Sequence, residues 1–479
     1  MTYRTTIGLE VHVQLNTRTK MFCGCPTGAG APPNTQVCPV CLGYPGVMPV
    51  MNGEAVRLTV LTGLMVGCTI SRSSKFDRKN YFYPDMPKNY QISQYDKPLC
   101  LGGAVEIDCG GAIKTVHLTR IHLEEDVGKS IHQARKSGLD FNRAGVPLME
   151  IVTEPDLETP DEAFAFLLTL KQMLLYLGVS DCNLEQGNLR CDINCSVRPE
   201  GQVALGTKVE IKNLNTFKGV HQALRYELDR QVEVVSGGGR LVQETRRWES
   251  DTGVTESMRT KEQAHDYRYF PEPDLMPVAL TEAQVEAWRA SLPELPRQKR
   301  ERFMAEYGIP EYDARVLAAQ KDVADFFDAA ARGSSAPKRV SNWVMTEMLR
   351  RLAEREMDIR DVQVTPAALR ELAEMTERQA INSTTAKEVF AILFEAGGDP
   401  AAIVRDRGWG QVSDEGSIAV LIDRVIAENA KSAEDYRAGK AAALKFLIGQ
   451  VMRLSQGKAN PQLVNEKLVR RLTRPEGPG

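Results

Sequence analysis

A carboxylate and an imidazole stand two positions apart near the start of the chain, at Glu10 and His12. The surrounding run, residues 6–13, alternates in polarity and predicts a β-strand. Because successive side chains of a strand point to opposite faces, Glu10 and His12 share one face. Such a pair can hold a cation, whereas an exposed polar face on a half-buried strand is the alternative interpretation.

Three consecutive acids, Glu124, Glu125 and Asp126, follow an apolar run that ends at Leu123. Adjacent carboxylates repel one another unless a positive charge neutralises them. Lys129 lies close enough in sequence to supply that charge, and a solvated loop is the alternative.

A further acid, Glu150, lies with Asp140 and Arg143 in the largely apolar segment 139–151. Burying charged groups there is costly unless each is paired or binds a metal. Chains bear this cost mostly where they do chemistry, so the segment is a candidate part of an active site.

Polar side chains occupy every even position from 190 to 198, and Cys, Ile and Val fill the odd positions. As a strand, this segment places all its polar groups on one face. Plain surface strands favour Thr, Lys and Glu over Asp and Asn, so the pattern indicates a ligand-facing floor. The floor comprises Arg190, Asp192, Asn194, Ser196 and Arg198, and Lys208, Glu210 and Lys212 repeat the pattern on the next predicted strand.

Four cysteines form two short pairs, Cys23 with Cys25 and Cys38 with Cys41, separated by twelve residues. Two such pairs can close a tetrahedral thiolate site, which suits zinc. All four positions are protein ligands, so we expect a structural site. The other six of the ten cysteines are expected to be small core residues.

Cations and aromatic residues are interleaved in three segments, residues 79–85, 88–91 and 255–274. Such segments can stack bases or hold a phosphate, whereas ordinary aromatic loops are the alternative. In the third segment Arg259, Lys261 and Arg268 could bind phosphate, or they could pair with Glu256, Asp266 and Glu272.

The elements that position these residues fall into three predicted domains. Residues 1–292 contain the strand patterns and two predicted helices, 159–178 and 220–235; residues 293–407 are charged, Ala/Leu-rich and helical; residues 408–479 form a small helical tail. From residue 431 the tail has ten Lys and Arg against four Asp and Glu, a net charge of +6.

Composition excludes some classes of protein. The 479 residues are 42% hydrophobic with a net charge of −3, which supports two to four domains and argues against global nucleic-acid coating. No apolar run reaches transmembrane length and the N-terminus lacks a signal-peptide core, so we expect a cytoplasmic protein away from membranes. There is no P-loop, no Gly-x-Ser-x-Gly elbow and no amidase-type Gly/Ser stretch.

The motifs resemble, in matching order, those of the GatB/GatE family, the B subunits of aspartyl/glutamyl-tRNA amidotransferases. The blocks that carry the resemblance are residues 7–15, the four cysteines, and residues 79–85, 139–151, 189–194 and 258–274. The helical region and the tail resemble the family's layout with weaker motifs. The resemblance implies an α+β fold, with a strand-rich, cradle-like catalytic domain, an all-helical domain and a small YqeY-like tail.

The resemblance also implies a reaction. In this family the B subunit uses ATP and Mg²⁺ to phosphorylate the side-chain carboxylate of Glu or Asp on a misacylated tRNA. Ammonia then displaces the phosphate, giving Gln-tRNA(Gln) or Asn-tRNA(Asn). A separate glutaminase, the A subunit, makes the ammonia, which travels through an internal channel, and a small C subunit wraps the other two.

Carried onto this sequence, the family's catalytic Mg²⁺ ligands fall on Glu10, His12, Glu125 and Glu150. Asp192 and its strand extend the floor toward ATP. The full expected sets are Arg190, Asp192, Asn194, Ser196 and Lys79 for ATP, Lys88 and Glu125 for the channel, and Lys431, Lys440, Lys445 and Arg453 for tRNA phosphates.

Two other functions compete with this hypothesis. A stand-alone zinc-containing RNA-binding module explains the cysteines and the tail but not Glu10, His12 or Glu150. An independent ATP-dependent carboxylate-amine ligase acting on a small molecule explains the acids but not the basic tail. ATP hydrolysis with and without misacylated tRNA separates the three.

Overall fold

The computed structural model describes residues 2–133, 136–260, 266–410, 415–455, 459 and 461–473. The chain divides into two compact units, residues 1–295 (unit 1) and 296–479 (unit 2). Unit 1 contains the strands and unit 2 is helical, which confirms the predicted α+β class.

A mixed sheet dominates the described part of unit 1, with strand order β15-β14-β13-β12-β1-β11-β8-β6-β2 and with β7 paired to β8. Its strands are β1 (Tyr3–Gln14), β2 (Thr69–Ile70), β6 (Cys100–Leu101), β7 (Ala104–Cys109), β8 (Ala112–Glu125), β11 (Pro147–Thr153), β12 (Leu189–Pro199), β13 (Val209–Lys212), β14 (Glu244–Glu249) and β15 (Val254–Thr260). The β13–β14 pair is parallel and the other pairs are antiparallel.

Short strands add smaller sheets to unit 1. They are β3 (Ser73–Ser74) with β17 (Val278–Ala279), β4 (Asp77–Asn80) between β5 (Tyr90–Ser93) and β16 (Phe270–Pro271), and β9 (Lys129–Gln133) with β10 (Lys136–Asp140). The three-stranded β16-β4-β5 sheet brings together segments that are far apart in sequence.

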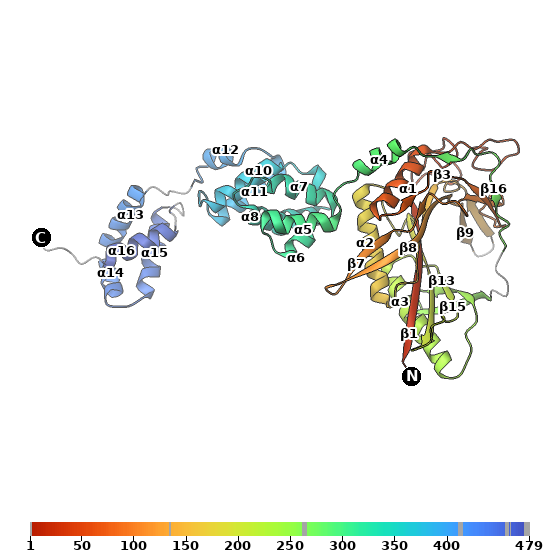
Figure 1. Ribbon diagram of the computed structural model, residues 1–479. Helices are drawn as coiled ribbons and strands as arrows, with labels where there is room; N and C mark the ends of the chain where they lie inside the picture. The colour runs from red at the N-terminus through yellow and green to blue at the C-terminus, as the bar shows by residue number, and fades with distance from the viewer. Residues whose placement is uncertain are drawn as a thin grey trace. The chain divides into compact units, whose positions relative to one another are not determined.

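The central strands follow the predicted alternation. Along β1 the odd residues Ile7, Leu9, Val11 and Val13 are fully buried, and the even residues occupy the opposite face. Helices α2 (Pro160–Leu177) and α3 (Phe217–Ser236) pack on the apolar face (Figure 1). α1 (Gly53–Met65) and α4 (Glu282–Ala290) complete the helices of this unit within the described residues.

The ends of α2 match the cap signals of the sequence. The Thr159 hydroxyl accepts a hydrogen bond from the Glu162 amide, Pro160 begins the helix, and Gly178 ends it with a φ of 66°. The left-handed conformation at Gly178 carries no Cβ penalty.

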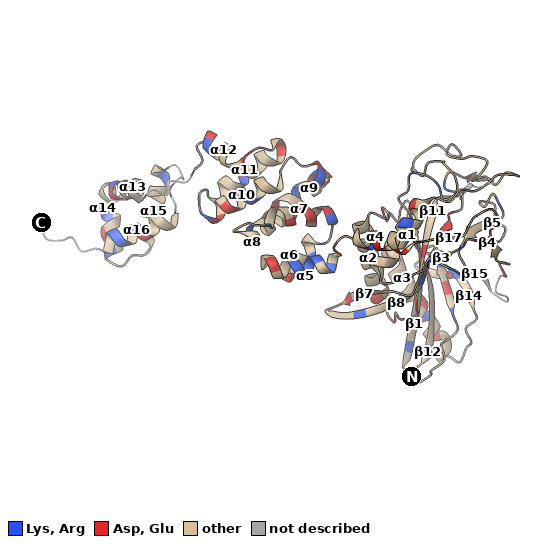
Figure 2. Ribbon diagram, turned by 45° about the horizontal axis from the view of Figure 1, so that its top comes forward, with Lys and Arg blue, Asp and Glu red and all other residues tan. Residues whose placement is uncertain are grey.

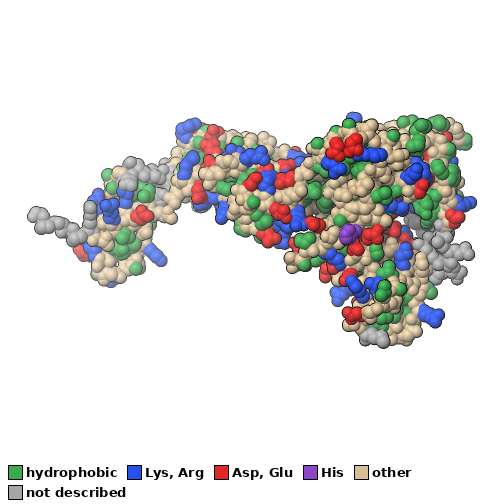
Figure 3. Space-filling view, viewed as in Figure 1, with side chains coloured by type: hydrophobic (Ala, Val, Ile, Leu, Met, Phe, Trp, Pro, Cys, Tyr) green, Lys and Arg blue, Asp and Glu red, His purple; other side chains and the backbone are tan. Residues whose placement is uncertain are grey.

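Unit 2 contains two separate hydrophobic cores. The first is formed by α5 (Pro296–Tyr307), α6 (Glu311–Leu317), α7 (Lys321–Ala331), α8 (Pro337–Asn342), the π-helix η1 (Trp343–Met348), α9 (Leu349–Arg355), the 3-10 helix η2 (Ile359–Asp361), α10 (Pro366–Glu377), α11 (Ser383–Ala396) and α12 (Pro400–Asp406). The second is formed by α13 (Glu415–Glu428), α14 (Ala430–Arg437), α15 (Ala442–Leu454) and α16 (Pro461–Thr473). On the face drawn in Figure 3, acidic and basic side chains are interspersed over these helices.

The contact boundary falls at residues 295 and 296, close to the predicted end of the first domain at 292. We retain the division 1–292, 293–407 and 408–479 as a proposal, supported by the two cores of unit 2. Across the described ranges, every helix is too short or too polar to cross a lipid bilayer.

Candidate active site

Strand register assembles a polar site on the face of the sheet opposite α2 and α3. β1 lies between β11 and β12, which places His12 opposite Glu150 on one side and Glu10 opposite Asp192 on the other. In the next pair, Glu150 stands opposite His122 of β8. Residues far apart in sequence therefore meet on one surface.

His12, Glu124 and Glu150 form the first group of possible metal ligands, and one ligand atom from each lies within 4.8 Å of the others. His12 Nε2 is 3.3 Å from Glu150 Oε2 and 3.8 Å from Glu124 Oε1. The two carboxylates suit Mg²⁺, and the imidazole is a less usual ligand that can also act through water.

A second histidine supports this group from the side. His122 Nε2 is 3.6 Å from Glu150 Oε2, and His122 is buried. Among the described residues, no hydrogen-bond partner meets its buried Nδ1. The Nε2 atom of His122 faces the Glu150 carboxylate, which fits a residue that orients the metal ligand.

The histidines on either side of Glu150 differ in pKa. Burial lowers the pKa of His12, but the Glu150 and Glu124 carboxylates outweigh it and raise this pKa to about 9. Burial dominates at His122 and lowers its pKa to about 4. His12 thus carries the positive charge that balances the acids, in the place where a metal ion would do so.

The two acids of this group also differ. Burial raises the pKa of the Glu124 carboxyl, and the Glu150 charge raises it further. At Glu150, burial acts in the same upward direction, but the two histidines hold the pKa below its usual range. A bound dication would lower the pKa of both carboxyls by neutralising their repulsion.

Glu10, Asp192 and Glu210 form a second group, again with ligand atoms within 4.8 Å of one another. Asn194 Nδ2 donates to Glu10 Oε1 at 2.9 Å, and Lys212 Nζ is 2.6 Å from Asp192 Oδ2. Burial, followed by the charges of Glu150 and Asp192, raises the pKa of the Glu10 carboxyl. The charges that act on Glu10 therefore come from both groups, from Glu150 of the first and from Asp192 of the second.

The structure leaves two of the predicted ligands, Glu125 and Glu10, outside the His12 group. Glu125 points away from His12: its Oε1 pairs with Lys88 Nζ and accepts a hydrogen bond from the Ile92 amide at 2.9 Å. β8 continues through residue 125, so strand alternation turns Glu124, and not Glu125, toward the site. Glu10 belongs to the Asp192 group and not to the His12 group.

The segment 139–151 contributes only Glu150 to these groups. Asp140 accepts hydrogen bonds from the amides of Asn34 and Asn142, and the Arg143 guanidinium donates to two backbone carbonyls. Gly145 has a φ of 85°, which turns the chain back into β11. Asp140 and Arg143 therefore shape the loop that delivers Glu150.

The expected ATP floor lies on the same face, next to the second group. Thr6, Asn194 and Ser196 line a cavity of about 250 Å³ that begins at Glu10. Asn194 Oδ1 is buried and, in the described chain, has no hydrogen-bond partner. Arg190 is directed elsewhere, because it pairs with Asp126 at 2.9 Å.

A separate cavity of about 240 Å³ adjoins the pair formed by Lys88 and Glu125. Lys20, Tyr90 and Cys41 also line it. The Lys88 ammonium lies 5.4 Å from the centre of the Tyr90 ring. Charged side chains and aromatic rings both line this cavity, which is compatible with passage of a small polar molecule.

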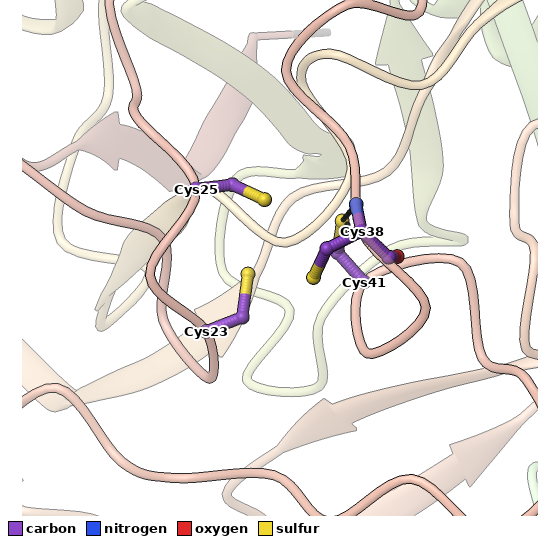
Figure 4. Close-up of side chains that lie close together, drawn as sticks. All are labelled: Cys23, Cys25, Cys38 and Cys41. Carbon is purple, nitrogen blue, oxygen red and sulfur yellow. Dashed lines mark hydrogen bonds between the residues drawn. The ribbon is translucent and has the colours of Figure 1, made fainter.

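The four predicted cysteines converge in loops after β1, and Figure 4 shows their sulfur atoms facing one another. All four Sγ atoms lie within 4.8 Å of one another. The Cys38 amide and Lys20 Nζ both contact Cys41 Sγ, at 3.2 and 3.5 Å. The hydrogen bond from Cys23 lowers the pKa of the Cys41 thiol to about 4, whereas the same hydrogen bond raises the pKa of Cys23 and burial raises that of Cys25 to about 11. Cys41 is therefore the thiolate of the metal-free cluster, and thiolate is the form that binds zinc.

Comparison with known proteins agrees with this geometry. The model of the GatB/GatE catalytic domain matches residues 5–286, and that of the GatB domain matches residues 325–472. The chain belongs to the GatB family. This confirms the resemblance inferred from the motifs.

Similar curated proteins span the same length. A protein from Caldanaerobacter subterraneus subsp. tengcongensis and one from Thermoanaerobacter sp. (strain X514) are each 53% identical over 475 residues, covering 99% of this chain and 100% of theirs. One from Thermodesulfovibrio yellowstonii is 52% identical over 98% of this chain and 99% of its own. Each is named as the B subunit of an aspartyl/glutamyl-tRNA(Asn/Gln) amidotransferase.

The GatB tail residues expected to meet tRNA lie on or beside α14 and α15. Lys431, Lys440, Lys445 and Arg453 are all exposed. Lys440 pairs with Asp435 at 2.9 Å. Figure 2 shows by colour that basic and acidic residues both occur along these helices.

Sequence reasoning missed two residues of the GatB face, Glu124 and His122, and left Glu210 unassigned. Their signal was present in the alternation of the run 116–123: continuing it by one residue puts Glu124 in phase with His122. A strand boundary drawn too early hid that phase. Lys261 and His265 of the third aromatic segment lie outside the described residues.

Proposed function

We propose that this chain is the B subunit of a tRNA-dependent amidotransferase, with its kinase-like active site on the polar face of the large sheet. The observation that carries this proposal is the convergence of two acid groups and one imidazole on that face. The names of its relatives supply the substrate class, Asp or Glu esterified to tRNA(Asn) or tRNA(Gln).

The chemistry explains why acids and ATP are needed together. A free carboxylate is a poor acyl donor because its leaving group would be oxide. In the first step a side-chain oxygen of the substrate attacks the γ-phosphorus of ATP, the bond to the β–γ bridging oxygen breaks, and ADP leaves. In the second step ammonia attacks the acyl carbon, the bond to the phosphoryl oxygen breaks, and phosphate and one proton leave.

Each group on the face has a role in the first step. His12, Glu124 and Glu150 would hold Mg²⁺, which when bound neutralises charge on the transferring phosphoryl group. Asn194 and Ser196 position the nucleoside of ATP in the adjoining cavity. Asp192 orients Lys212, whose ammonium lies beside the phosphate path.

Lys79 supplies a further positive charge next to the first group. Burial lowers the pKa of Lys79. Nearby negative charges, of which Glu124 is the strongest, outweigh burial and raise this pKa above its usual value. Lys79 therefore stays protonated and stabilises phosphoryl oxygens by charge. Lys79 does not act as a neutral general base.

Ammonia is supplied by a partner with amidase chemistry, the A subunit, and a small third protein, the C subunit, completes the heterotrimer. The cavity at Lys88 and Glu125 is the proposed entry passage for ammonia, since Glu125 stands on the strand that also presents Glu124. The basic tail binds tRNA phosphates, the cysteines hold structural Zn²⁺, and the complex works in the cytoplasm.

The direct test is Glu150→Gln in the chain assembled with its A and C partners. We expect loss of tRNA-dependent ATP hydrolysis, with glutamine hydrolysis retained. Glu154→Gln is the matched control, because Glu154 directly follows the same strand and its carboxylate accepts a hydrogen bond from the Thr119 hydroxyl, outside both acid groups. ATP turnover at the wild-type rate in Glu150→Gln would refute the metal role; assays on both misacylated tRNAs establish which substrate is used.

A further inference from the structure

Four tyrosines gather beside the first acid group, and the mechanism above does not use their rings. Tyr81 follows β4, Tyr95 follows β5, and Tyr267 and Tyr269 precede β16. We call these four residues the tyrosine strip. Figure 2 labels β4 and β5, the paired strands that carry one side of it.

The rings of the strip form a continuous series of contacts. Tyr95 and Tyr269 are stacked with centroids 4.2 Å apart and planes 8° apart. Tyr269 meets Tyr267 edge-on at 6.0 Å, and Tyr267 meets Tyr81 edge-on at 5.8 Å. Asn80 fixes this arrangement, because its amide and its side chain both donate to the Tyr267 carbonyl.

Part of the strip is open to solvent. The exposed fraction of Tyr95 is 50%, and neighbouring Phe82 and Tyr83 are exposed by 77% and 58%. A stacked pair that remains half exposed can accept a further planar ring. Exposed aromatic surface of this kind is a feature of sites that stack bases of single-stranded nucleic acid.

Lys79 joins the strip to the acid group. Its ammonium lies 5.1 Å from the centre of the Tyr267 ring and 5.7 Å from that of Tyr81. Two ring faces therefore hold its charge. Ser93, at the end of β5 and two residues before Tyr95, donates to Glu124 Oε2 at 3.4 Å, so the strip borders the first acid group.

The nucleoside of ATP has a different place on the same face. The cavity that Glu10 lines is also lined by Asn194, Ser196 and Lys208, and none of the described residues that line it comes from β4, β5 or β16. In-line phosphoryl transfer brings the nucleophile and the leaving group to opposite sides of phosphorus. With ATP bound on the β12 side, the carboxylate that accepts the phosphoryl group approaches phosphorus from the side of Lys79.

We propose that the tyrosine strip binds the 3′-terminal nucleotide of the misacylated tRNA, by stacking the terminal base on its rings. The inference rests on the proposed function. The amino acid is esterified to the terminal ribose, so the substrate's side-chain carboxylate is tethered to the terminal base through the amino acid, the ester and the ribose. When that carboxylate lies at Glu124 and Glu150, the base must lie nearby. The strip offers rings, and Lys79 and Arg268 offer positive charge for the phosphate backbone.

The test uses the full chain assembled with its partner subunits and a tRNA whose terminal adenine is replaced by 2-aminopurine. Stacking on tyrosine quenches this fluorophore, and we expect quenching on binding to the wild type. Tyr267→Leu and Tyr95→Leu should at least halve the quenching and raise the KM for misacylated tRNA roughly fivefold to a hundredfold. The KM for ATP should stay within about twofold.

Two variants serve as controls. Tyr267→Phe keeps the ring and should retain the quenching. Tyr312→Leu removes an exposed tyrosine of α6, far in sequence from the strip, and should change neither quantity. Tyr95 is half exposed, so its substitution preserves a folded protein even where Tyr267→Leu lowers the melting temperature.

Three outcomes would overturn the inference. A rise in the KM for ATP in place of that for tRNA would assign the strip to the ATP base. Equal losses in Tyr267→Phe and Tyr267→Leu would assign the effect to the Tyr267 hydroxyl and not to stacking on its ring. The third outcome is a wild-type complex that hydrolyses ATP in response to tRNA but shows no quenching. If Glu150→Gln abolishes that ATP hydrolysis, the inference is refuted while the proposed function stands.

Discussion

Two of the candidate metal sites of unit 1, the cysteine site and the His12 site, are built in different ways. The cysteine site takes four ligands from two loops that are close in sequence, whereas the acid site takes His12, Glu124 and Glu150 from three strands of one sheet. The loop site depends on local spacing and on soft ligands. The sheet site depends on register, so one residue of error in a strand reverses which acid faces the metal.

This contrast explains what could be predicted from sequence. The cysteine set was complete because its pairs are short and local, and α2 was placed to within a residue by Thr159, Pro160 and Gly178. Glu10, His12 and Glu150 were found on the correct face because alternation is visible within each strand.

Pairing between strands is what the sequence alone could not define. Nothing in the run 116–126 states where β8 ends, and the choice between Glu124 and Glu125 depends on that end point. Grouping Glu10 with Asp192 and not with His12 depends on β12 lying on the far side of β1 from β11. Such long-range register is a property of the folded sheet.

The largest expected effect separates the two neighbouring acids of β8. Glu124→Gln should lower tRNA-dependent ATP hydrolysis by roughly a hundredfold or more, because it removes a proposed metal ligand. Glu125→Gln should retain that ATP hydrolysis and lose glutamine-dependent amide formation. Steady-state rates of ADP and amide formation on misacylated tRNA measure both; the reverse pattern would restore Glu125 as the ligand.

A substitution in the cysteine site should lower the stability of the protein and should not act on the reaction chemistry. Cys41→Ser should reduce bound zinc from about one atom per chain to well below one and lower the melting temperature by several degrees, because structural zinc contributes folding free energy. Elemental analysis and thermal unfolding provide the two readouts. Cys109→Ser, outside the cluster, is the control; a zinc content equal to wild type in Cys41→Ser would contradict the assignment.

The acid site should be sensitive to pH through His12. Its folded pKa, about 9, lies above the ordinary value of 6.5. Without metal, the stability from charged His12 is therefore fully present below about pH 6.5 and is lost as pH rises through 9. Protonation competes with metal binding, so apparent Mg²⁺ affinity should rise over this interval by up to about tenfold per pH unit.

Calorimetric Mg²⁺ titrations from about pH 6.5 to about 9.5 measure that slope. His12→Asn should bind Mg²⁺ more weakly and with a flatter pH dependence. His221→Asn is the control, because His221 pairs with Asp161 away from the acid groups. A slope unchanged by His12→Asn would place the titrating group elsewhere.

A smaller, graded effect is expected in the tail of unit 2. Replacing Lys431, Lys440, Lys445 and Arg453 with Gln should weaken tRNA binding and reduce the slope of log affinity against log salt, by about one per lost phosphate contact at most. The KM for ATP should not change. Equal salt slopes for the quadruple variant and the wild type would remove the tail from the tRNA interface.

The central claim is that strands far apart in sequence bring one imidazole and two carboxylates to a single metal ion. Pulsed electron paramagnetic resonance of Mn²⁺ bound to ¹⁵N-histidine-labelled protein reports directly on nitrogen ligands. We predict a ¹⁵N coupling in the wild type and in His221→Asn, and its loss in His12→Asn. Strong Mn²⁺ binding without that coupling, or a coupling that persists in His12→Asn, would contradict the account.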